Sequence, residues 1–156
     1  MLAKHQTKYT NYMLPDKYPT MRSINYIIIH CTATPEGREH DVEDIRRWHK
    51  AKGWSDIGYH YLIKIDGTIE PGRSVEIPGA HARGFNHDSI GIVYVGGMDS
   101  DMKAPKDTRT APQKQSFGQL LWALKEEFPN AKIIGHRDVS TKACPSFDAK
   151  SEYGEH

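Results

Sequence analysis

Residues 24–30 read INYIIIH, a short apolar run rich in β-branched side chains. A run of this length and composition predicts a buried β-strand. The segment that follows, CTATPEGREH (31–40), is rich in turn-forming residues. The predicted strand therefore ends at His30, where the chain leaves the sheet.

Two helices are marked by their ends. Asp41, with Asp44 three residues later, has the pattern of an N-cap with a capping box, and Gly53 ends that helix. Thr110 begins a second helix with the pattern T-x-x-Q. Its apolar residues form one stripe, and Pro129 ends it.

The remaining segments predict strands. The dipeptide Asp66-Gly67 lies between two strand-like runs and indicates a hairpin. The predicted order is strand, helix, hairpin, strand, helix and strand, over residues 24–30, 41–53, 58–73, 89–97, 110–128 and 132–135. This order predicts an α/β domain with a central mixed sheet flanked by helices.

Length and charge narrow the class of protein. A chain of 156 residues suits one domain with a hydrophobic core. Its net charge of +1 gives no basic surface of the kind that binds nucleic acid or anionic membranes. No apolar run approaches the roughly 20 residues that span a bilayer. We therefore expect neither nucleic acid nor membrane insertion.

The first 22 residues form an N-terminal extension ahead of a domain over residues 23–150. The extension is polar, with scattered aromatic residues, and lacks the apolar stretch of a signal peptide. We therefore expect synthesis in the cytoplasm, which leaves later release by lysis or another route open. Met21 is an alternative start within the extension.

Three residues at strand ends suggest a metal site. His30 closes the first strand, His136 directly follows the last one, and Cys144 lies eight residues further on the same loop. In α/β proteins, functional sites gather where strands end. Two imidazoles and one thiolate suit zinc, and three protein ligands leave the fourth position to water or substrate, as in catalytic zinc sites.

Each of these residues also has a simpler explanation. Most histidines are not metal ligands, and a buried cysteine often packs as a small hydrophobic residue. Cys31 follows His30 on a strand and so points to the opposite face, which places it in the core. A disulfide between Cys31 and Cys144 is the rival assignment, and it would remove the metal-binding thiolate.

Four stretches together resemble a known family. They are IIIHCTAT (27–34), IRRWHKAKGWSDIGYHYLIKIDGTIEPGR (45–73), AHARGFNHDSIGIVYVGG (80–97) and GHRDVSTKACPSFD (135–148). In this order they resemble the zinc-dependent N-acetylmuramoyl-L-alanine amidases, and especially the phage lysozyme-type amidases, which share a fold with peptidoglycan recognition proteins. The resemblance spans residues 24–148 and implies the same fold.

The resemblance also implies roles for individual residues. His30, His136 and Cys144 match the ligands of one zinc ion per chain, and Tyr59 and Lys142 match the catalytic tyrosine and lysine. Non-catalytic recognition proteins of this fold typically lack the cysteine ligand. The presence of Cys144 therefore favours an enzyme.

The implied reaction is hydrolysis of the amide between the lactyl group of N-acetylmuramic acid and L-alanine in peptidoglycan. Zinc polarises the carbonyl and lowers the pKa of bound water to near 7. A lysine ammonium and a tyrosine hydroxyl stabilise the oxyanion, an effect worth about 3–4 kcal/mol per donor in other enzymes. The enzyme would act on the cell wall, and we expect a monomer.

One loop matches a family loop at the cleft. Within AHARGFNHDS (80–89), the resemblance implies substrate contacts from His81, Arg83, Phe85 and Asn86. A hydrogen-bonded structural loop is the equal alternative.

Other classes of function remain as rivals. The nearest is a peptidoglycan-binding module without catalysis, and another is an interaction protein that uses the N-terminal extension. The sequence leaves the preferred stem peptide open.

Overall fold

The computed structural model describes residues 22–154. The predicted N-terminal extension, apart from Arg22, and the alternative start at Met21 lie outside the described residues.

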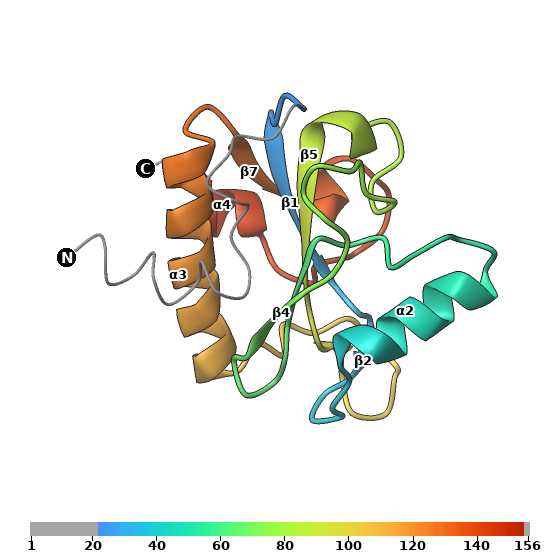
Figure 1. Ribbon diagram of the computed structural model, residues 1–156. Coiled ribbons are helices and arrows are strands. Elements are labelled where there is room, and N and C mark those ends of the chain that lie inside the picture. Colours follow the sequence, from blue (N-terminus) through green and yellow to red (C-terminus); the bar gives the residue numbers. More distant parts are fainter. Residues whose placement is uncertain (1–21, 155–156) are drawn as a thin grey trace.

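A five-stranded mixed sheet forms the centre of the domain (Figure 1). Its order is β4-β3-β5-β1-β7. β1 is parallel to both of its neighbours, β3 is parallel to β5, and β4 is antiparallel to β3. The strands are β1 (Tyr26–Cys31), β3 (Tyr61–Ile63), β4 (Ile69–Pro71), β5 (Ser89–Tyr94) and β7 (Lys132–Gly135). The predicted mixed sheet is confirmed.

The predicted hairpin is β3 and β4. Gly67 has a φ of +89°, a conformation that favours glycine, and the N–H of Thr68 donates to the Asp66 carboxylate at 2.9 Å. The Asp66-Gly67 turn therefore sets the hairpin, as the sequence predicts.

Both predicted helices begin at their predicted caps. In α2 (Val42–Ala51), Asp41 and Asp44 form a reciprocal capping box. In α3 (Ala111–Glu127), Thr110 and Gln113 form the second one. Each box satisfies backbone N–H groups that the first turn of a helix leaves without partners.

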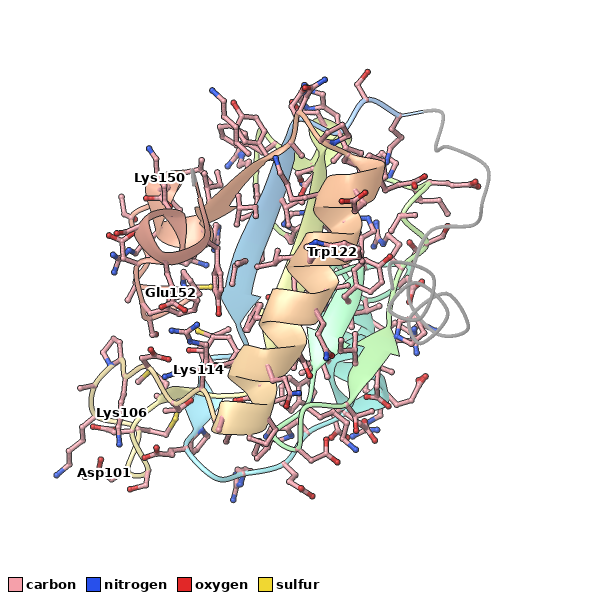
Figure 2. The ribbon with its side chains drawn as sticks, turned by 90° about the vertical axis from the view of Figure 1, so that its left-hand side faces the viewer. Asp101, Lys106, Lys114, Trp122, Lys150 and Glu152 are labelled. Atoms are coloured by element: carbon pink, nitrogen blue, oxygen red, sulfur yellow. The ribbon has the colours of Figure 1, made fainter. Side chains whose placement is uncertain are left out.

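α3 covers one face of the sheet, and Figure 2 views the molecule from this side. Phe117, Leu120 and Leu124 of α3 are fully buried against the odd-numbered side chains of β1. Cys31 belongs to this core, as predicted from its place on the strand.

The opposite face carries α2 and the loops around it (Figure 1). Val42 and Ile45 of α2 pack with Leu62 and Val93 of the sheet. Because side chains alternate along a strand, His30 points to this face. The face covered by α2, rather than the one covered by α3, therefore holds the candidate site.

Several short elements were not predicted. They are β2 (Thr34–Pro35) paired with β6 (Gly97–Met98), the 3₁₀ turns η1 (Asn86–Asp88) and η2 (His136–Asp138), and α4 (Ala149–Tyr153). Across residues 22–154, no helix has the length and apolar character needed to cross a membrane.

Candidate metal and catalytic centre

Two adjacent strands bring His30 and His136 together. β1 and β7 are in register up to Ile29 and Gly135, so the next residue of each strand lies at the same edge of the sheet. The two rings lie 4.6 Å apart between centroids. His30 is only 1% exposed, whereas His136 is partly exposed, so the pair runs from the core to the surface.

The loop after β7 brings Cys144 back to the same point. The Tyr94 hydroxyl donates to the carbonyl of Pro145 at 2.7 Å. The Ser146 hydroxyl donates to the carbonyl of Gly97 at 2.9 Å. Both bonds anchor the residues directly after Cys144 to β5 and β6, so the loop is held against the sheet.

The two cysteines are close but unjoined. Both thiols are free. The N–H of Cys31 points at the Cys144 sulfur, with a nitrogen–sulfur distance of 3.2 Å. The sulfur of Cys144 also lies 3.8 Å from Nδ1 of His30. Cys144 therefore faces the histidines as a thiol, and the rival disulfide is not present.

The donor atoms fit a zinc ion. The ligand atoms of His30, His136 and Cys144 all lie within 4.8 Å of one another. Zinc binds nitrogen at about 2.0–2.1 Å and sulfur at about 2.3 Å, so tetrahedral ligands lie roughly 3.5 Å apart. The distance of 3.8 Å between His30 Nδ1 and the Cys144 sulfur is close to that value. Small side-chain movements would complete the set.

The protonation states of the two histidines also suit metal binding. Burial holds the pKa of His30 well below its usual value, and the His81, His136 and Lys142 charges lower it further. Burial and then Lys142 lower the pKa of His136. Both imidazoles are therefore neutral near pH 7 and offer a lone pair. The hydrogen bond with Cys31, and then burial, raise the pKa of Cys144, so its thiol is protonated and would release that proton on binding a metal.

Tyr59 lies beside the candidate metal site. Its ring centroid is 4.9 Å from that of His30 and 5.5 Å from that of His49. Its carbonyl accepts the N–H of Arg73 at 2.9 Å, which fixes its backbone. Burial raises the pKa of Tyr59. The phenol therefore stays protonated at neutral pH and can donate a hydrogen bond.

Lys142 lies on the exposed side of the site. Its charge contributes to lowering the pKa of both His30 and His136, after burial. Its backbone N–H donates to the Ser140 hydroxyl at 3.2 Å, within the same loop. Lys142 is thus placed to meet a bound molecule from the solvent side.

The predicted substrate-binding residues occupy different positions. His81 is hydrogen-bonded to His30, with 2.8 Å between His81 Nδ1 and His30 Nε2. The Asn86 side chain accepts the N–H of His81 at 2.9 Å and so braces the loop. Phe85 packs edge-on against Tyr26 at 5.4 Å between centroids. These contacts are with the protein itself, and the predicted contacts with substrate stay predictions.

Arg83 differs from its neighbours in this loop. It is exposed, and no hydrogen bond from its side chain is present within residues 22–154. Of the four predicted substrate-binding residues, it is the exposed one, whereas His81, Phe85 and Asn86 are partly exposed.

Two residues next to the site had no predicted role in it. Nδ1 of His49 accepts the N–H of Gly58, directly before Tyr59, at 2.8 Å. Ser89 is fully buried, and its hydroxyl lies 3.1 Å from Nε2 of His81. The only sequence signal for His49 is the helical periodicity of α2, which places it on the buried face. No sequence signal distinguishes Ser89.

The comparison with protein families decides the identity. The sequence model of one protein family, described as N-acetylmuramoyl-L-alanine amidase, matches residues 20–147. The chain belongs to the N-acetylmuramoyl-L-alanine amidase family. It is a peptidoglycan hydrolase with this activity, as the sequence resemblance implied.

Relatives of the amidase include a phage endolysin and a bacterial amidase. It is 44% identical to the endolysin of Escherichia phage T7 over 135 residues, which are 86% of this chain and 88% of the relative. The solved structure of the amidase LysC from Clostridium intestinale matches this chain with a TM-score of 0.72 and 29% sequence identity. The match covers 90% of this chain and 91% of LysC. The predicted amidase fold is therefore confirmed.

The fold is also shared with a recognition protein. A mutant of Drosophila PGRP-LB, solved in complex with tracheal cytotoxin, has a TM-score of 0.69 and 26% identity to the amidase. The match covers 94% of this chain and 89% of that one.

Proposed function

We propose that the amidase uses one zinc ion, held by His30, His136 and Cys144, to hydrolyse the bond between N-acetylmuramic acid and L-alanine. The observation that carries this proposal is the approach of two neutral imidazoles and one thiol to within 4.8 Å at the edge of the sheet. The three residues leave a fourth position open, as catalytic zinc sites require.

The bound zinc would supply a Lewis acid for the scissile carbonyl and an activated water. The Tyr59 hydroxyl, held protonated by burial, donates a hydrogen bond toward the reacting amide. The Lys142 ammonium approaches from the solvent side and stabilises the negative charge that develops on the carbonyl oxygen. The two residues therefore act on one transition state from different sides.

We propose a muropeptide as the substrate and the cell wall as the place of action. The endolysin relatives and the cytotoxin complex of the PGRP-LB mutant support this assignment. We further propose synthesis in the cytoplasm, a monomer, and residues 23–150 as the unit that carries activity. α4 continues to Tyr153, so the folded part reaches slightly past that boundary.

The proposal is tested on purified peptidoglycan, with mass spectrometry of the released ends. We expect stem peptides that begin with L-alanine, lost on chelation and restored by zinc. Cys144→Ala removes the thiolate and should abolish zinc binding and release. The matched control is Cys31→Ala, which removes the neighbouring thiol and should retain both.

Two results would contradict the proposal. Full activity of Cys144→Ala would exclude the thiolate as a ligand. Binding of peptidoglycan without new L-alanine ends would make the protein a recognition module.

A further inference from the structure

We propose that His81 and Ser89 are positioning residues, which fix the ring orientation and tautomer of His30 so that its Nδ1 faces the zinc ion. This inference rests on the proposed zinc site. It gives His81 a role behind the metal ligand instead of a role in binding substrate.

A line of three polar side chains, His30, His81 and Ser89, leads away from the site. Nδ1 of His30 faces the Cys144 sulfur at 3.8 Å, while Nε2 of the same ring lies 2.8 Å from Nδ1 of His81. Nε2 of His81 in turn lies 3.1 Å from the Ser89 hydroxyl. The rings of His30 and His81 meet nearly at right angles, at 84°.

With zinc on Nδ1 of His30, these contacts would fix where the protons lie. Nδ1 of His30 can bind zinc only with a free lone pair, so the proton of that ring must be on Nε2. The Nε2–H of His30 then donates to Nδ1 of His81, which places the His81 proton on its own Nε2. That N–H donates to the Ser89 hydroxyl oxygen. Each contact in the line is thus satisfied when His30 is in its metal-binding tautomer.

The fold leaves His81 little freedom to move. A side chain at Gly91 of β5 would bring a Cβ within 2.7 Å of the His81 ring, so glycine is needed for the ring to pack on the strand. The Asn86 side chain accepts the N–H groups of both His81 and Ala82 at 2.9 Å. The ring is thus held by its own backbone, by β5 and by Ser89.

The partner of His30 is a neutral imidazole. Metal-binding histidines usually donate their second N–H to a carboxylate, a carbonyl or water. Among residues 22–154, the His30 ring makes no hydrogen bond with a carboxylate. His81 therefore orients the ligand without adding negative charge to it, which preserves the electron-withdrawing power of the ion.

The test compares zinc affinity, by competition with a chelator, in four variants. His81→Leu removes the acceptor, and Ser89→Ala removes the end of the line. His81→Asn places an amide oxygen near the position of Nδ1. His87→Leu is the control, because His87 lies on the same loop with an exposed side chain. The cobalt-substituted absorption spectrum and the thermal unfolding of the metal-free proteins are recorded alongside.

We expect the zinc dissociation constant to rise about 10–100-fold in His81→Leu, the range found for such partners, and less in Ser89→Ala. His81→Asn should recover most of the loss, and His87→Leu should match the parent. A shifted cobalt spectrum in His81→Leu, with unfolding of the metal-free protein unchanged, would separate positioning from general destabilisation.

Parental zinc affinity in folded His81→Leu would overturn the inference. If His81→Leu does not fold, parental affinity and cobalt spectrum in Ser89→Ala would overturn it instead. Failure of the parent itself to bind zinc would overturn the proposed function, and so the two failures are distinguishable.

Discussion

Burial separates the residues of the site into two groups. His30 is 1% exposed and its environment is set by the core, whereas Lys142 is exposed at the rim. A buried imidazole can serve as a fixed ligand, and an exposed ammonium can reach a bound molecule. At the scale of the residue, we therefore expect the two groups to fail in different ways when substituted.

Replacing Lys142 with methionine should lower kcat by roughly 10²–10³-fold, the cost of removing one oxyanion donor in other enzymes. Zinc affinity should stay within a few-fold of the parent, because Lys142 is not a ligand. The measurement is steady-state hydrolysis of a soluble muropeptide, with zinc content determined on the same sample.

Lys150→Met is the control for this substitution. Lys150 is exposed on α4 and lines a hollow together with Trp122 of α3, on the side of the sheet opposite to the site. An unchanged kcat in Lys142→Met, or an equal loss in Lys150→Met, would argue against a catalytic lysine.

The helices and the hairpin were predicted because their signals are local. The capping boxes at Asp41 and Thr110 and the turn at Asp66-Gly67 depend on residues within a few positions of one another. The pairing of β2 with β6 involves two residues on each side and has no periodicity to detect. At the scale of the element, the sequence therefore predicts structure that depends on neighbouring residues. It does not predict the pairing of two short strands that lie far apart in the chain.

Gln113 joins α3 to the sheet and gives a test at this scale. Its side-chain nitrogen donates to the carbonyls of Val95 at 3.0 Å and Ile63 at 3.3 Å, and its oxygen accepts the N–H of Thr110. Gln113→Leu leaves these buried groups unpaired. We expect it to lower the free energy of unfolding by about 2–3 kcal/mol, measured in urea.

The control is Gln115→Leu, two residues further on the same helix and exposed. We expect it to change the free energy of unfolding by less than about 0.5 kcal/mol. Equal effects of the two substitutions would show that the buried bonds of Gln113 contribute little.

At the scale of the whole molecule, the sequence predicts that the ligands lie at strand ends. It does not predict which side chains pack behind those ligands. His81 and Asn86 lie on a polar loop that resembles a substrate-binding loop. Only the packing of that loop over Gly91 shows that His81 reaches His30 from behind. Such contacts depend on which strands are neighbours, and a linear pattern does not contain that information.

His60 links the stability of the whole fold to pH. It is 1% exposed, its Nδ1 accepts the N–H of Gly91 at 3.0 Å, and its Nε2–H donates to the carbonyl of Ile77 at 2.9 Å. Burial lowers the pKa of His60 to about 4. The unfolded chain, with a pKa near 6.5, therefore binds more protons between pH 6.5 and 4, and stability falls as the pH falls through this range.

The test compares the free energy of unfolding of the parent protein with that of His60→Gln. Both proteins are metal-free, so that loss of zinc in acid does not contribute. The destabilising effect of the substitution should be smaller at pH 4.5 than at pH 7.5 by about 2 kcal/mol, measured by urea unfolding. A cost that is the same at both pH values would mean that His60 takes up its proton equally in the folded and unfolded chains.

In the proposed mechanism, His30, His136 and Cys144 together hold one zinc ion. The most direct measurement is anomalous X-ray scattering at the zinc edge from crystals grown with one equivalent of zinc. We predict one peak, about 2.0–2.1 Å from a nitrogen of each histidine and about 2.3 Å from the Cys144 sulfur. A peak elsewhere, or no peak in protein that hydrolyses peptidoglycan, would contradict the account.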